Sequence, residues 1–284
     1  MTSERRRSFG EDAELYDRAR PGYPEALYDD LLRVTGLGKG DRVLEVGCGT
    51  GQATVPLARR GFRLTAVELS RSLARVARRN LRPFPNARVR VGEFERLRRP
   101  RVPFDLVLAA TAFHWIDPAV RVRKAAEMLR PGGYLAVVHT HHVLGGSRKF
   151  FAESQRCYRR FFPRSSAGYR LPRPHEVVRV GSGPGSSLWF SPLASLSYRW
   201  QRTYSTENYL DLLRTYSDHR SLGTRRREEL LRCLGSLIDR RFGGRVRKAH
   251  LTELTLVTRN DRPVRPTDGT FAATTRSGIP RRAR

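Results

Sequence analysis

The stretch RVLEVGCGTGQ at residues 42–52 constrains the fold more than any other part of the chain. Its apolar members, Val43, Leu44 and Val46, suit a short strand that is buried on both faces of a parallel sheet. Glycines at 47, 49 and 51 then allow a tight turn where the backbone approaches a ligand closely. An amphipathic segment over 52–60 follows and predicts a helix. Strand, glycine turn and helix in this order open a nucleotide-binding β-α-β unit.

The charges around this turn indicate which nucleotide it binds. Glu45 lies two residues before the first glycine, where a carboxylate disfavours phosphate and suits an ammonium group. No Lys-Ser or Lys-Thr pair follows the glycines, so this is not a phosphate-binding P-loop. Glu68 ends the next apolar run, 21 residues after Gly47, which is the interval of a carboxylate that binds ribose hydroxyls. A ligand with an ammonium, a ribose and no phosphate is S-adenosylmethionine.

The residues Glu45–Gly51 (EVGCGTG) resemble motif I of the class I S-adenosylmethionine-dependent methyltransferases. Further landmarks agree in order, among them Gly92-Glu93 after a short strand and LRPGG at 129–133. The resemblance extends over residues 16–142 and is to the small-molecule branch, which includes trans-aconitate and quinone-biosynthesis methyltransferases. The alternative interpretation is a chance glycine turn in another α/β fold.

The resemblance implies a Rossmann-like α/β fold. It has a mostly parallel seven-stranded sheet with an antiparallel last strand, helices on both faces, an N-terminal helical cap and a cap inserted after the strand at 134–140. The expected organisation is a disordered start (1–10), the helical cap (11–38), the cofactor-binding core (39–144), the inserted cap (145–190), the C-terminal part of the fold (191–259) and a disordered tail (260–284).

Periodicity and capping residues place the individual elements. Ser70 is expected to be the N-cap of a helix that ends at Asn80, and Gly243-Gly244 to end a helix over 225–242. Further helices are predicted at 11–20, 25–35 and 119–129, and strands at 64–67, 89–91, 104–110, 134–140, 196–204 and 251–257.

The resemblance also carries over cofactor-binding roles. Tyr16 and Arg20 would face the methionine carboxylate, unless their helix merely covers the sheet edge. Glu93 stands where the family usually has Asp, one methylene longer, and would bind the adenine amino group. The complete expected cofactor set is Tyr16, Arg20, Glu45, Gly47, Cys48, Gly49, Gly51, Glu68, Leu69, Glu93, Phe94 and Ala110.

Residues beyond the strand at 104–110 are candidates for the chemistry, because ligands lie past the carboxyl ends of parallel strands. His114 is the candidate general base, or alternatively part of an aromatic pocket wall. Phe113, Trp115 and His141 are expected to line the acceptor pocket, with His142 as the alternative to His141. The histidines at 139, 141 and 142 have no acidic ligand nearby and no helical His-x-x-x-His spacing, so no metal is predicted.

The composition contains one misleading signal, a formal charge of +28. Only four of the 55 basic residues are lysine, and the arginines are scattered over every predicted helix, as a GC-rich genome would produce. The charge is therefore interpreted as solvated surface and not as a nucleic-acid site. Three cysteines without metal or redox spacing predict reduced thiols in a cytoplasmic protein. No apolar run is long enough for a membrane span and no signal peptide is expected.

These observations predict a cytoplasmic methyltransferase, monomeric or homodimeric, that uses S-adenosylmethionine to methylate a small molecule at oxygen, carbon or nitrogen. The Asp/Asn-Pro-Pro-aromatic motif of enzymes that methylate base amines is missing, because its position holds residues 111–114 (TAFH). Two alternatives remain open. One is an RNA or protein methyltransferase that uses the basic surface, and the other is a catalytically silent binding module with the same fold.

Overall fold

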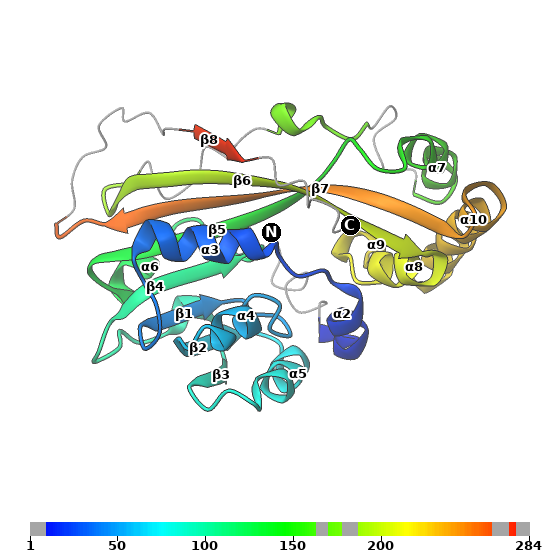
Figure 1. Ribbon diagram of the computed structural model, residues 1–284. Coiled ribbons are helices and arrows are strands. Elements are labelled where there is room, and N and C mark those ends of the chain that lie inside the picture. The colour runs from blue at the N-terminus through cyan, green and yellow to red at the C-terminus, as the bar shows by residue number, and fades with distance from the viewer. Residues whose placement is uncertain (1–9, 163–169, 178–186, 263–272, 277–284) are drawn as a thin grey trace.

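The computed structural model describes residues 10–162, 170–177, 187–262 and 273–276. Its eight strands form one sheet in the order β3-β2-β1-β4-β5-β7-β6-β8 (Figure 1). Strands β1 to β5 pair in parallel, β7 is antiparallel to both β5 and β6, and β8 pairs in parallel with β6. The strand bounds are Arg42–Val46 (β1), Arg63–Glu68 (β2), Ala87–Val91 (β3), Phe104–Ala110 (β4), Leu129–Val143 (β5), Phe190–Ser205 (β6), Arg245–Arg259 (β7) and Ala273–Arg276 (β8).

Helices cover both faces of the sheet because side chains alternate along each strand. On β4, Leu106 and Leu108 join the apolar cluster that contains α3 and α4, whereas Val107 and Ala109 join the cluster that contains α6. The helix bounds in this part are Ala13–Ala19 (α2), Glu25–Thr35 (α3), Thr54–Arg59 (α4), Arg71–Leu81 (α5) and Arg121–Met128 (α6), and single 3₁₀ turns lie at Phe94–Arg96 (η2), Phe113–Trp115 (η3) and Pro174–Glu176 (η4).

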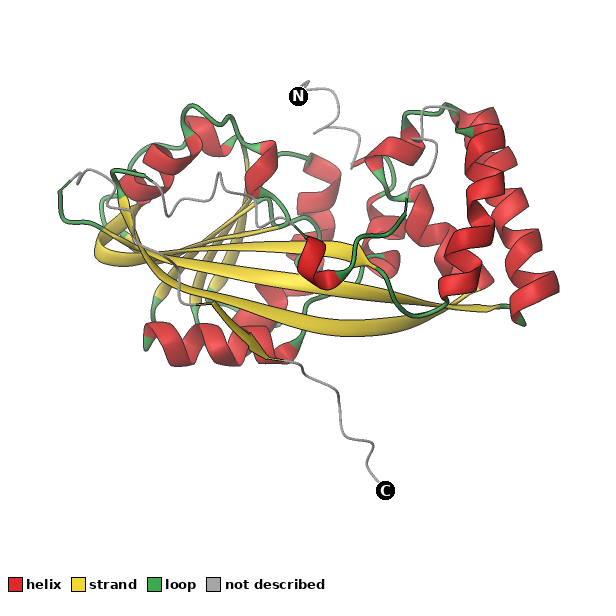
Figure 2. Cartoon of the chain, turned by 90° about the horizontal axis from the view of Figure 1, so that it is seen from above, coloured by secondary structure: helices red, strands yellow, loops and turns green. Residues whose placement is uncertain are grey.

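Three strands continue well past this core. β5, β6 and β7 are 15, 16 and 15 residues long, and β6 and β7 run onward to a group of helices with a separate apolar cluster (Figures 1 and 2). We call this group the helical lobe; it consists of α7 (Arg148–Phe161), α8 (Thr206–Arg214), α9 (Ser217–Arg220) and α10 (Thr224–Phe242). The lobe draws on segments 148–161 and 206–242, which lie on either side of β6 in the sequence.

Most elements that the sequence predicts are confirmed. The strand at 104–110 and the helix at 25–35 have the predicted bounds, and the Ser70 hydroxyl accepts a hydrogen bond from the Leu73 amide as N-cap of α5. The predicted Rossmann-like α/β fold, with a mostly parallel sheet and an antiparallel last core strand, is also confirmed. The prediction of a disordered tail is wrong for residues 273–276, because they add β8 to the edge of β6. The predicted disordered start, except residue 10, lies outside the described residues.

The prediction of three reduced thiols is wrong for two of them. Cys157 of α7 and Cys233 of α10 form a disulfide, with their Cα atoms 5.9 Å apart, while Cys48 is a buried free thiol. Sequence spacing did not indicate this pair because the residues are 76 positions apart and meet only when α7 packs against α10. The bridge therefore ties together the two segments of the helical lobe.

Loss of this disulfide is expected to lower the free energy of unfolding by about 2–4 kcal/mol, because the bridge closes a long loop in the unfolded chain. For a chain of this size that change corresponds to a melting temperature lower by roughly 5–10 °C. Differential scanning calorimetry of the wild type with and without reductant measures it. Cys233→Ser is the control, since reductant should no longer change its melting temperature; a wild type that is equally insensitive would contradict the pairing.

Candidate functional site

The glycine turn after β1 has a backbone that only glycine adopts easily. Gly47 and Gly49 have φ of +68° and +59°, in the left-handed region. A Cβ at Gly47 would lie 2.7 Å from the Cβ of Ala112, so the turn also packs against the segment that follows β4. The amides of Gly47 and Cys48 both donate hydrogen bonds to the Val67 carbonyl at the end of β2. These bonds fix the turn at the carboxyl edge of the sheet.

Glu68, the last residue of β2, connects this turn to the start of α5. Its Oε2 accepts a hydrogen bond from the Gly49 amide at 2.9 Å, and its Oε1 accepts one from the Ser70 amide at 2.8 Å. The side chain is buried, yet it lines a pocket. Its carboxylate is therefore held in one orientation by two backbone donors at the edge of this pocket.

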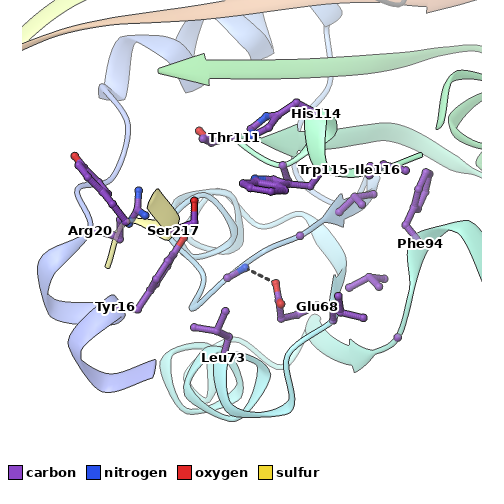
Figure 3. A pocket seen from close by; sticks show the side chains of 18 of the residues that line it. Tyr16, Arg20, Glu68, Leu73, Phe94, Thr111, His114, Trp115, Ile116 and Ser217 are labelled. Atoms are coloured by element: carbon purple, nitrogen blue, oxygen red, sulfur yellow. Dashed lines mark hydrogen bonds between the residues drawn. The ribbon is translucent and has the colours of Figure 1, made fainter. Parts of the chain in front are cut away.

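The pocket around Glu68, here called the glycine-loop pocket, has a volume of about 290 Å³. Figure 3 shows Tyr16 and Arg20 at one side of it, Phe94 at the other, and Trp115 over Glu68. Its lining residues come from α2, the turns after β1 to β4, and α9: Tyr16, Arg20, Val46, Gly47, Gly49, Val67, Glu68, Leu69, Leu73, Gly92, Phe94, Thr111, Ala112, His114, Trp115, Ile116, Tyr216, Ser217 and Asp218.

Two further cavities adjoin this pocket. A narrow cavity of about 160 Å³ lies on the other side of the glycine turn and is lined by Glu45, Cys48, Tyr23, Ala110 and His250, among others. A wide cavity of about 860 Å³ lies between the sheet and the helical lobe. Arg20 and Tyr216 line all three cavities, so these two side chains mark the point where the cavities meet.

Glu45 is the buried acid of the narrow cavity. It is 1% exposed, and its Oε2 has no hydrogen-bond partner among the described residues. Burial, with a further contribution from the negative charge of Glu68, raises the pKa of Glu45 to about 8, although the nearby Thr54 hydroxyl opposes the shift. The carboxyl group is therefore mostly protonated at pH 7, and a cation brought next to it would favour its ionised form.

His114 lines the glycine-loop pocket from η3, beside Trp115 and His139, with ring centroids 5.1 and 5.7 Å away. Burial and the positive charges of His139 and Arg121 lower the pKa of His114 to about 4. The imidazole is therefore neutral at pH 7 and able to accept a proton, but its basicity is weak. This arrangement serves an aromatic wall better than a strong general base.

Four of the predicted site residues lie outside the three cavities. Gly51 ends the glycine turn, and Glu93 pairs with Arg96 at 2.8 Å. Phe113 is buried in the apolar cluster of α6, and His141 bonds Glu253 on the opposite face of β5 from the cavities, with 3.1 Å between His141 Nε2 and Glu253 Oε2. The neighbouring His142 lines the narrow and wide cavities instead, because adjacent side chains of a strand point to opposite faces.

Sequence reasoning missed the residues that the long strands and α9 contribute. Thr140 of β5, Lys248 and His250 of β7, Trp200 of β6 and Tyr216 before α9 line the narrow cavity, beside His142, which was predicted as the alternative to His141. One signal was available, since Lys248 is one of only four lysines in an arginine-rich chain. Nothing in the linear sequence, however, indicated that these positions converge.

Residues 43–133 match the family described as "Methyltransferase domain". An uncharacterized methyltransferase of Mycobacterium tuberculosis is 38% identical over 131 residues, which are 46% of this chain and 51% of that protein. The chain thus spans about half the length of its first curated relatives. Demethylmenaquinone methyltransferase of Tropheryma whipplei is 31% identical over 183 residues, 62% of this chain and 71% of that enzyme.

The fold has a counterpart among solved structures. A putative type II methyltransferase from Anaeromyxobacter dehalogenans superimposes with a TM-score of 0.60 at 22% identity, covering 87% of this chain and 99% of that one. The sheet order, the glycine turn with its two acids, and these matches define a class of protein. The chain belongs to the class I S-adenosylmethionine-dependent methyltransferases.

The family's cofactor, S-adenosylmethionine, fits the residues present. The positive-φ glycines leave open backbone beside Glu68, and the unpartnered Oε2 of Glu45 is an acceptor suited to an ammonium donor. Among the described residues, no group of three His, Cys, Asp or Glu side chains is placed to hold a metal ion. In the same part of the chain, no helix has the length and apolar character that crossing a membrane requires.

Proposed function

We propose that this protein transfers the methyl group of S-adenosylmethionine to a small organic acceptor that binds in the wide cavity. The observation that carries the proposal is the adjacency of the three cavities around Arg20 and Tyr216. The glycine-loop pocket supplies a cofactor site, and the wide cavity, about 860 Å³, has the size of a small-molecule site. Its position under the helical lobe suits an enclosed small molecule better than a nucleic-acid strand.

In this proposal each end of the cofactor has its own acid. Glu68 accepts hydrogen bonds from the ribose hydroxyls, while Leu69 and Phe94 form the apolar walls for the adenine. Glu45 faces the ammonium group, and Arg20 the carboxylate, of the methionine part. When bound, S-adenosylmethionine supplies an electrophilic methyl group, and the protein supplies alignment and exclusion of water.

The histidines that line the cavities are weak bases. His114 has a pKa near 4, and the other imidazoles that line the cavities, His142 and His250, also have pKa values below the usual range because they are buried near cations. An acceptor that is already a nucleophile at neutral pH needs no stronger base. The proposed reaction is therefore methylation of such an acceptor, with His114 as a wall of the pocket.

Calorimetric titration with S-adenosylmethionine and S-adenosylhomocysteine tests the cofactor site first. The expected result is binding of both in the micromolar range, roughly −8 kcal/mol. Radiolabelled methyl transfer to panels of small organic acids, phenols and amines, with bulk RNA beside them, then tests the acceptor class. Absence of cofactor binding would overturn the proposal, and transfer only to RNA would assign the basic surface the function instead.

A further inference from the structure

The wide cavity is strongly cationic. Its described lining includes five basic side chains, those of Arg20, Arg148, Arg159, Arg170 and Lys248, and a single acid, Asp218. Some of these charges are compensated within the protein. Arg170 makes two hydrogen bonds to the carboxylate of Glu176, at 2.8 and 3.1 Å, and Asp218 lies beside His219. This compensation does not extend to Lys248.

Lys248 is the buried cation among these five. It is 3% exposed and, as the fourth residue of β7, lines both the narrow and the wide cavity. Its Nζ donates a hydrogen bond to the Tyr216 hydroxyl at 2.7 Å and lies 5.0 Å from the centre of that ring. Within the described parts of the chain, no carboxylate forms an ion pair with Lys248. Burying an ammonium group without a counter-charge is unfavourable because it loses its hydration, and an anionic ligand would offset this loss.

Two imidazoles near Lys248, those of His142 and His250, each have a ring nitrogen without a hydrogen-bond partner among the described residues. His142 and His250 face each other across the β5–β7 pairing, with ring centroids 6.2 Å apart, and His250 stacks on Trp200 at 4.2 Å. The Nε2 atom of each is buried without a hydrogen-bond partner among the described residues. Burial and the charge of Lys248 keep both rings neutral by lowering their pKa values, that of His250 to about 3. A neutral imidazole can donate to an anion through its N–H.

The geometry points to a binding site for one carboxylate group of the methyl acceptor at the junction of the wide and narrow cavities, formed by the ammonium of Lys248 with His142, which both line the two cavities, and His250, which lines the narrow one. This inference rests on the proposed function, and it adds the chemical class of the acceptor, an organic carboxylate. One formal positive charge with neutral donors around it matches a single negative charge. Arg20 does not take part in this site, because the proposed function assigns it to the methionine carboxylate of the cofactor. Lys248 thus acts in this proposal as a residue that determines acceptor specificity.

A matched pair of ligands tests the site without knowledge of the natural acceptor. 1-Naphthoate carries a carboxylate, and 1-naphthamide has nearly the same shape without the charge. Both are titrated into wild-type protein, free and saturated with S-adenosylhomocysteine, at constant ionic strength, and binding is followed by calorimetry. The wild type is expected to bind 1-naphthoate at least tenfold more tightly than 1-naphthamide, a difference of about 1.4 kcal/mol.

Lys248→Met, and Lys248→Gln as a second variant, are expected to remove this preference while 1-naphthamide binds as before. Lys149→Met is the matched control, because Lys149 is an exposed lysine on α7, and it should keep the tenfold preference. Melting temperatures establish that the variants are folded. Equal affinity of the wild type for the two ligands, no binding of either, or a preference that survives in both Lys248 variants would overturn the proposal.

The same titrations separate this inference from the proposed function. A tenfold loss of S-adenosylhomocysteine affinity in the Lys248 variants would assign Lys248 to the cofactor's carboxylate and overturn the acceptor site. Tighter binding of 1-naphthyl phosphate than of 1-naphthoate would overturn the choice of a carboxylate. If the wild type binds no S-adenosylhomocysteine, the proposed function fails, while the preference of the free protein for 1-naphthoate is measured independently.

Discussion

Replacing Glu68 by glutamine is expected to weaken S-adenosylmethionine binding at least tenfold. The carboxylate accepts hydrogen bonds from the Gly49 and Ser70 amides, and an uncharged side-chain amide would turn one donor group toward a backbone donor. The variant thereby loosens the glycine turn and also loses a charged acceptor for the ribose hydroxyls. Calorimetric titration of the wild type and Glu68→Gln measures the change.

Glu93→Gln is the comparison for this experiment. Glu93 was expected to bind the adenine, but its carboxylate pairs with Arg96 outside the glycine-loop pocket. Its replacement should change affinity by less than about threefold, a difference of under 1 kcal/mol. The opposite ranking, with a large loss in Glu93→Gln and none in Glu68→Gln, would show that the adenine and ribose roles are wrongly assigned.

Binding of S-adenosylmethionine is expected to release a proton from Glu45. With a pKa of about 8, Glu45 is mostly protonated at pH 7 in the free protein. Binding the ammonium group of the cofactor next to it favours the carboxylate, so close to one proton should leave on binding. Calorimetric titration at pH 7 in phosphate and in Tris, which differ in ionisation enthalpy, counts the released protons. Glu45→Gln is the control and should release none.

The same group makes the stability of the free protein depend on pH. The folded-state pKa of about 8 exceeds the ordinary value of 4.5, so the folded state retains a proton that the unfolded state loses. The contribution of Glu45 to the free energy of unfolding is therefore fully present below about pH 4.5. It falls as pH rises toward 8, by up to about 5 kcal/mol. Glu45→Gln should remove this part of the decline in melting temperature. Identical pH profiles for the variant and the wild type would contradict the assigned protonation state.

The sequence predicted the fold best where local signals were unambiguous. The run Phe104–Ala110 is apolar except for Asp105 because β4 is buried on both faces, and its bounds were predicted as observed. The three long strands were predicted too short for the opposite reason. Beyond the core, the cavity-facing polar residues His142 and Lys248 interrupt the apolar alternation, so the pattern covered less than the whole of β5 and β7. The strand predicted at 196–204 begins at Phe190 in β6.

The site was predictable only on its cofactor side. Glu45 and Glu68 lie at fixed intervals from the glycines, and a local motif specifies such intervals. The proposed acceptor side is assembled from residues far apart in the chain. Tyr216 and Lys248 are joined by a hydrogen bond, and the guanidinium of Arg20, which follows α2 some 200 residues earlier, lies over the Tyr216 ring. No periodicity or spacing in the sequence indicates that residues so far apart lie in contact, and the Cys157–Cys233 pairing was missed for the same reason.

The length of β6 and β7 has a consequence for how such a protein can diverge. The helical lobe has its own apolar cluster and its own disulfide, but it is joined to the cofactor half through the register of these two strands. Substitutions on the inner surfaces of α7 and α8 can change which molecules enter the wide cavity without displacing the glycine turn. A one-residue slip between β6 and β7 would instead invert every cavity-facing side chain of the slipped strand. The preference for one methyl acceptor over another can therefore change between related proteins, while the distance between the methyl donor and the acceptor site stays the same.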